Sequence, residues 1–133
     1  MEWSELIKYV KRFVSNFENA GFMSIQRGDW SGRLPLLSYN IIPNDDGTGF
    51  YENGVFYHKA KIEFLVIEDV KEIDGTLPID RAMIKAGKIK SRLIADERIN
   101  FIKINEITAF DYKQGKLLDK TILMLECSAI YTV

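Results

Sequence analysis

The chain has 133 residues, of which 47% are hydrophobic and 28% are charged, and this length and composition predict one globular domain, residues 1–133. The formal net charge of -1 excludes a general attraction to nucleic acid or acidic membranes, so an electrostatic partner must bind a local patch. The single cysteine excludes an intramolecular disulfide, and the single histidine excludes a metal site with several histidines from one chain.

Residues 3–20 are expected to form an amphipathic helix. Their hydrophobic side chains recur at steps of three and four residues, which places one stripe on the helix: Trp3, Leu6, Ile7, Val10, Phe13, Val14 and Phe17. Gly21 follows the stripe and can end a helix in the left-handed conformation. We interpret the stripe as part of the core.

The next segment is less regular. Residues 22–36 are interpreted as a loop, in which Trp30 lies between Gly28 and Gly32. The run of residues 37–42 favours a strand.

The stretch NDDGTGFYENG, residues 44–54, is polar apart from Phe50 and Tyr51. It does not match a calcium-binding loop, because with Gly47 at position 6 the acidic ligands of positions 1 and 12 are missing. Asp-Asp-Gly and Glu-Asn-Gly are instead typical of turns. We expect a long loop over about residues 43–54, with the two aromatics on a short extended arm at its tip.

Residues 55–68, VFYHKAKIEFLVIE, predict the strongest strand, in which Ile62, Phe64 and Val66 alternate with charged residues. A second helix is expected over residues 76–97. Its buried stripe is predicted to comprise Ile79, Met83, Ala86, Ile89 and Leu93.

Two strands are expected to follow, at about 99–112 and 117–132, joined by a tight turn at residues 113–116. Cys127 lies on the apolar face of the last strand and is interpreted as a core residue. This order of elements predicts an α+β fold, a small antiparallel or mixed sheet with the N-terminal and mid-chain helices packed on one face.

Four basic residues of the second helix, Arg81, Lys85, Lys88 and Arg92, lie at steps of four, three and four, which places them on one line. This basic stripe is either a solvated face or an electrostatic contact with a neighbouring subunit or a phosphate backbone. His58 is interpreted as a packing residue of its strand, because no Ser or Cys motif for nucleophilic catalysis lies near it in the sequence.

With these elements placed, the chain resembles the tail terminator proteins of tailed bacteriophages and of phage-tail-like particles. The resemblance rests on the N-terminal helix ELIKYVKRFVSNF, the irregular connection LPLLSYNIIPNDDGTGFYENG, the strand YHKAKIEFLVIE, the helix LPIDRAMIKAGKIKSRLIA and the closing strand KTILMLECSAIYTV. It implies a structural virion protein with no enzymatic activity and no cofactor, which forms a hexameric ring at the end of the tail. Assembly would take place in the cytoplasm of the host bacterium.

The resemblance also implies partners. These are other copies of the chain, the tail tube protein, a neck or head-completion protein and, where the tail contracts, the sheath, with DNA only as cargo passing through the channel. The candidate residues for the interface between subunits are Trp30, Asp46, Phe50 and Tyr51.

Two alternatives stay open. The chain is also compatible with another head–tail or baseplate connector. A small ligand-binding or enzymatic α+β domain would instead have a pocket with convergent polar groups around Tyr57, His58 and Asp111.

Overall fold

The computed structural model describes residues 1–43, 49–113 and 116–133, with side chains for all of these except residues 108–113 and 116–119. Within these ranges two helices and six strands follow one another along the chain. Their bounds are α1 (Trp3–Ser15), β1 (Ser24–Arg27), β2 (Leu36–Ile42), β3 (Gly49–Glu52), β4 (Val55–Asp69), α2 (Pro78–Ile94), β5 (Asn100–Lys113) and β6 (Lys116–Tyr131). Of the turn expected at residues 113–116, Gln114 and Gly115 lie outside the described residues.

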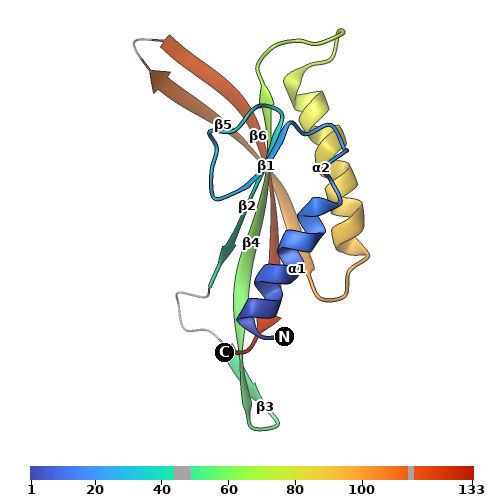
Figure 1. Ribbon diagram of the computed structural model, residues 1–133, viewed down its shortest axis with the longest axis vertical. Helices are drawn as coiled ribbons and strands as arrows, with labels where there is room; N and C mark the ends of the chain where they lie inside the picture. Colours follow the sequence, from blue (N-terminus) through green and yellow to red (C-terminus); the bar gives the residue numbers. More distant parts are fainter. Residues whose placement is uncertain (44–48, 114–115) are drawn as a thin grey trace.

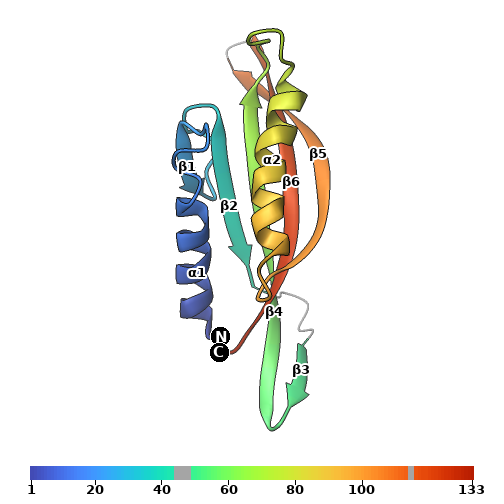
Figure 2. The same cartoon turned by 90° about the vertical axis from the view of Figure 1, so that its right-hand side faces the viewer.

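The strands form one sheet in the order β1-β2-β4-β6-β5, and β3 pairs with the part of β4 that precedes its contact with β2. β1 and β2 are parallel, whereas the other pairs are antiparallel, so the sheet is mixed. Both helices cover the same face of this sheet (Figure 1, Figure 2). The expected α+β fold with two helices on one face is therefore confirmed.

The main core lies between the helices and the sheet. The alternation expected in β4 is confirmed, because Ile62, Phe64 and Val66 are fully buried on the face that the helices cover. β6 contributes Leu123, Leu125, Cys127, Ala129 and Tyr131 to the same core. Phe13 of α1 packs its ring against Phe64, with centroids 5.4 Å apart. The stripe of α1 is thus core, as its periodicity predicts.

Two predictions about the helical layer need correction. Met83 was expected in the buried stripe of α2, but it is 49% exposed, and Ala82 is buried in its place. The α-helical part of residues 3–20 ends at Ser15, and turns continue to Gly21, which has the expected positive φ of 89°. The Met83 error arises because positions 82 and 83 both fit a stripe at helical spacing, and only packing against the sheet selects between them.

The opposite face of the sheet is divided into an apolar half and a charged half. Leu36, Leu65, Ile67 and Ile122 form a second buried cluster, against which Leu34 of the β1–β2 connection packs. In the charged half, Lys61 pairs with Glu63 at 3.1 Å and with Glu126 at 2.8 Å. These hydrogen bonds, above all the one to Glu126, raise the pKa of Lys61, and the bond from Lys61 lowers the pKa of Glu126.

Strand β1 was not expected, because residues 22–36 were interpreted as a loop. Its four residues are too few to show a periodic pattern. In the loop expected at 43–54, the short extended arm that was predicted to carry Phe50 and Tyr51 is a paired strand. Residues 44–48 lie outside the described residues, but Gly49–Glu52 form β3 and pair with the start of β4.

The molecule is elongated along β4, which has 15 residues and so runs for roughly 50 Å at about 3.3 Å per residue. One end of β4 extends with β3 past the rest of the molecule, and the other end leads into the connection to α2 (Figure 1). Neither α1 nor α2, the helices of the described ranges, has the length and apolar character needed to cross a membrane.

Candidate interaction surfaces

The projecting end of β4 and its partner β3 form a hairpin, residues 49–58, which we call the arm (Figure 1). Asn53 and Gly54 form its two-residue turn, and both have positive φ angles, 50° and 78°. A turn with two positive φ angles matches the twist of the strands that it joins, and Asn-Gly is its preferred sequence. The turn residues recognised in the sequence therefore fold the stretch back as a hairpin.

An aromatic row runs along one face of the arm and continues into the body. The rings of Tyr51 and Phe56 are 4.8 Å apart, and those of Phe56 and His58 are 4.7 Å apart. His58 stacks on Tyr131 at 5.2 Å, and Tyr131 contacts Trp3 of α1 at 4.8 Å. Aromatic pairs add about 0.5–1.5 kcal/mol beyond the burial of their area. The row therefore holds the arm in a defined position on the core.

The other face of the arm carries a second aromatic pair. Phe50 stacks on Tyr57, with ring centroids 5.2 Å apart. Gly49 is required at its position, because an added Cβ atom would lie 2.5 Å from the Phe56 ring and from the carbonyl oxygen of Tyr57. A glycine that lets an aromatic ring cover the backbone is a known way to fix a β-hairpin.

The tip of the arm leaves apolar surface in contact with solvent. Tyr51 is 76% exposed, Val55 42% and Phe50 37%. The prediction of aromatics at an exposed tip is therefore confirmed for Tyr51 and in part for Phe50. The outer edge of β3 pairs with no other strand of the described ranges, so its backbone groups are open to a partner.

The structure does not bring the four candidate interface residues together. The side chain of Lys120 donates a hydrogen bond to the carbonyl oxygen of Trp30, and Lys120 is paired with Asp69 at the far end of β4. Trp30 is thus about 40 Å along the strand from the arm, at about 3.3 Å per residue. Asp46 lies outside the described residues.

The residues of the pocket expected for the ligand-binding or enzymatic alternative do not converge either. Tyr57 and His58 are strand neighbours and point to opposite faces, Tyr57 toward Phe50 and His58 toward Tyr131. The side chain of Asp111 lies outside the described part. No group of three or more His, Cys, Asp or Glu side chains in the described ranges is placed to hold a metal ion.

Half of the basic stripe on α2 is buried rather than solvated. Glu68 of β4 is fully buried and faces α2, where Lys85 and Arg81 both pair with it. The distance from Arg81 Nε to Glu68 Oε2 is 3.4 Å, and only 11% of the Arg81 side chain and 14% of the Lys85 side chain are exposed. The interpretation of these two residues as a solvated face is therefore wrong.

Arg81 also holds the segment of residues 69–77, which we call the braced loop. Its guanidinium donates hydrogen bonds to the carbonyl oxygens of Asp69 at 2.9 Å, Lys71 at 2.7 Å and Thr76 at 2.6 Å. With the bond to Glu68, all three guanidinium nitrogens are engaged. One buried ion pair thus orders the connection between β4 and α2.

The braced loop has a tight turn of its own and an apolar surface. Asp74 and Gly75 have φ angles of 51° and 75°, and the backbone groups of Ile73 and Thr76 exchange two hydrogen bonds across them. Three aliphatic side chains of the loop remain in solvent: Val70 is 46% exposed, Ile73 49% and Leu77 51%. An apolar surface on an ordered loop indicates a site for a partner.

The other half of the stripe is solvent-exposed. Lys88 lines a depression of about 350 Å³ between α2 and residues 19–21. Arg92 lies over the ring of Phe17, with its guanidinium carbon 5.9 Å from the centroid. Lys88 and Arg92 therefore fit the prediction of an exposed basic surface.

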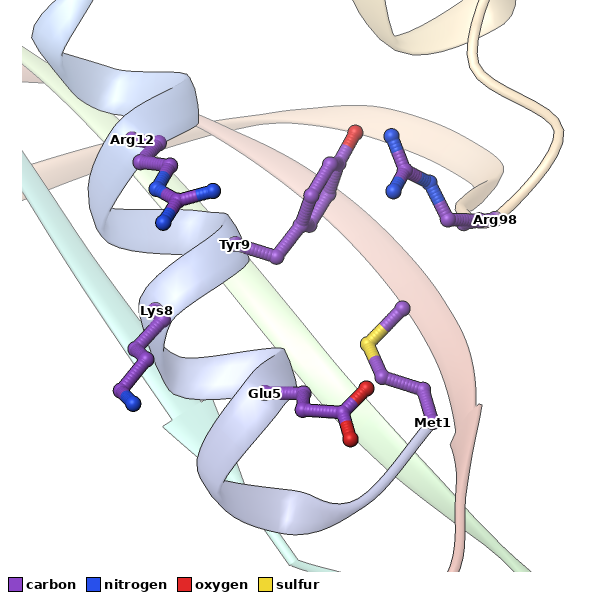
Figure 3. Close-up of a pocket in the computed structure, with 6 residues that line it drawn as sticks. All are labelled: Met1, Glu5, Lys8, Tyr9, Arg12 and Arg98. Atoms are coloured by element: carbon purple, nitrogen blue, oxygen red, sulfur yellow. The ribbon is translucent and has the colours of Figure 1, made fainter.

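A second basic surface, absent from the sequence predictions, lies between α1 and the residues that follow α2. Arg98 stacks over Tyr9, with its guanidinium carbon 4.2 Å from the ring centroid. Figure 3 shows Arg12 to the left of this pair and Glu5 and Met1 below it. Together with Lys8, these residues line a pocket of about 220 Å³, which we call the basic groove.

The sequence matches no protein-family model, and no curated protein matches it. The role of the molecule must therefore be inferred from its surfaces.

Sequence reasoning missed the braced loop, although two signals were present. The alternation that buries Ile62, Phe64 and Val66 also directs Glu68 into the core, where a carboxylate needs a cation. The sequence Asp74-Gly75 is a turn signal of the same kind as Asn53-Gly54 in the arm.

Proposed function

We propose that the chain is a structural subunit that assembles into a ring, in the manner of the bacteriophage tail terminator proteins that it resembles. The observation that carries this proposal is the arm. Its backbone is fixed by aromatic contacts, while Tyr51, Val55 and Phe50 at its tip are exposed to solvent. Aromatic side chains on a preorganised element lose little entropy on binding, which is a property of strong protein contacts.

The position of the arm allows a heterologous contact between copies. The arm leaves the body at one end of an elongated molecule (Figure 2). If it binds a different surface of the next copy, the contact is heterologous, and heterologous contacts close into rings or continue as filaments. A closed ring at the end of a tail tube would stop tube growth and offer its other face to a neck or head-completion protein.

The first test is the oligomeric state of the purified chain. We expect rings in negative-stain images and a matching mass by light scattering. Replacing both tip aromatics, Phe50→Ser and Tyr51→Ser, should leave a folded monomer with unchanged circular dichroism, because these side chains lie outside the core. The matched control is Met23→Ser, a residue 61% exposed outside the arm, which should leave rings intact.

The second test addresses the tail. Purified rings should bind the open end of assembled tail tubes and prevent further addition of tube subunits. A wild-type chain that stays monomeric at every concentration would contradict the proposal as a whole. Rings that bind no tube end would contradict the terminator role.

A further inference from the structure

We propose that the braced loop of one copy docks in the basic groove of the next copy, so that each subunit contributes one of these two surfaces to every contact. This inference rests on the proposed assembly of the chain, and it names a contact in addition to the arm. Three observations carry it: the charge of the two surfaces, the order of the braced loop and the size of the groove.

The braced loop and the first turn of α2 form an acidic surface. Residues 69–80 contain Asp69, Glu72, Asp74 and Asp80 but only one basic residue, Lys71. Among these, Glu72, Asp74 and Asp80 are exposed to solvent. The acidic residues stand next to the exposed aliphatic side chains of Val70, Ile73 and Leu77.

The loop is ordered before any partner binds. Arg81 donates to three of its carbonyl oxygens and is itself paired with buried Glu68. Fixing the backbone of a free residue costs about 1–2 kcal/mol of conformational entropy. In the folded chain the hydrogen bonds from Arg81 already offset this cost for the loop. A partner surface therefore gains most of the contact energy that the loop offers.

The basic groove has the opposite charge. Its lining includes Lys8, Arg12 and Arg98 but only one acidic residue, Glu5. Within the described part of the chain, no carboxylate lies within ion-pair distance of Lys8 or Arg12, whereas Arg98 pairs through its Nε with Asp96 Oδ1 at 3.4 Å. Tyr9 and Met1 add an apolar wall suited to an aliphatic side chain (Figure 3).

The size of the groove selects its occupant. Pockets for small molecules usually have about 300–1,000 Å³. The groove has about 220 Å³, which suits one or two side chains of a protein partner. Guanidinium groups bind carboxylates with paired hydrogen bonds, so Arg12 is matched to Glu72 or Asp74 of another copy. Arg98 already donates from its Nε to Asp96, and its two terminal nitrogens remain for a second carboxylate.

Two charge variants test the contact. The loop variant, Glu72→Lys with Asp74→Asn, makes the loop more positive by three charges and keeps a residue that tolerates the positive φ at position 74. The groove variant, Arg12→Glu with Arg98→Gln, makes the groove more negative by three charges. Each variant alone should self-associate at least about tenfold more weakly than the wild type in sedimentation velocity, because like charges then face each other.

Mixing the two variants in equal amounts should restore assembly. In the mixture the positive loop of one variant meets the negative groove of the other, and the remaining wild-type surfaces also complement each other. We expect association within about threefold of the wild type. The control, Lys11→Glu with Arg33→Gln, also makes the chain more negative by three charges, as the groove variant does, but on exposed residues outside the groove. It should leave the association constant unchanged.

The results separate this inference from the proposed function. If rings persist in both variants but disappear when the arm tip is changed, the docking of loop and groove is wrong and the ring proposal stands. If both variants lose assembly and their mixture does not regain it, the two surfaces do not meet. A wild-type chain that forms no assembly would overturn both ideas.

Discussion

The arm and the braced loop lie at opposite ends of β4 and both expose hydrophobic side chains, but different interactions keep them in place (Figure 1). The arm is ordered by contacts between side chains of its own hairpin, such as Tyr51 with Phe56 and Phe50 with Tyr57. The loop is ordered by Arg81, which lies on another element and shares a buried carboxylate with Lys85.

This difference separates assembly from stability. The arm makes its contacts locally, so it can be disrupted while the core stays folded. The loop depends on Arg81, which also pairs with Glu68 inside the core. Losing Arg81 therefore releases the loop and leaves the buried carboxylate of Glu68 with Lys85 alone. Two surfaces that look alike from outside should therefore respond differently to mutation.

The largest expected effect is that of Arg81→Gln. Removing one partner of a buried ion pair costs about 3–5 kcal/mol, and because Lys85 still pairs with Glu68 in this variant, we expect a loss of about 3 kcal/mol. For a domain of this size that loss lowers the melting temperature by roughly 10 °C or more. The matched control is Lys88→Gln, an exposed residue of the same stripe, which should change stability by less than about 0.5 kcal/mol. Equal melting temperatures for the two variants would show that the brace contributes nothing.

The next effect is on the reactivity of Cys127, which reports on the opening of the core. Burial, and secondarily the charge of Glu126, raises the pKa of the Cys127 thiol to about 12, so at pH 8 the folded protein holds the unreactive protonated form. Alkylation then follows the population of open molecules. We expect labelling with iodoacetamide to be about a hundredfold faster in Arg81→Gln, since each 1.4 kcal/mol is a factor of about ten. The Phe50→Ser, Tyr51→Ser variant should label at the wild-type rate, and fast labelling of that variant would refute the independence of the arm.

A smaller effect is expected for Gly49→Ala, in which the new Cβ atom meets the Phe56 ring and the backbone at Tyr57. The clash should displace β3 and abolish assembly, while the global stability falls by less than about 1 kcal/mol because few core contacts are lost. The control is Gly87→Ala in α2, where nothing lies within 4 Å of the added atom. That change should raise stability by about 0.5–1 kcal/mol, the cost of glycine in a helix. Full assembly of the Gly49→Ala variant would argue against a role for the arm.

Much of the fold follows from local pattern. The spacing of Leu6, Val10 and Phe13 and the alternation in β4 identify helix and strand, because burial on one side imposes a period of 3.6 or 2 on the sequence. Asn53-Gly54 marks the turn of the arm for an equally local reason, since only a few residues adopt its positive φ angles. The exposed aromatics of the arm could therefore be predicted with no knowledge of the tertiary structure.

The braced loop and the basic groove could not be predicted from the sequence. Glu68 and Arg81 are 13 residues apart on different elements, and Tyr9 and Arg98 are far apart in the sequence, with α1 carrying the first and the segment after α2 the second. A charged residue has the same sequence signature whether it faces solvent or a buried partner, so the stripe of Arg81, Lys85, Lys88 and Arg92 is uniform in sequence but divided in space. The sequence by itself determined which elements form and which of their faces are apolar, because both depend on periodicity along the chain. Only the tertiary structure decided which charges pair and which surfaces remain for a partner, because long-range packing brings those groups together.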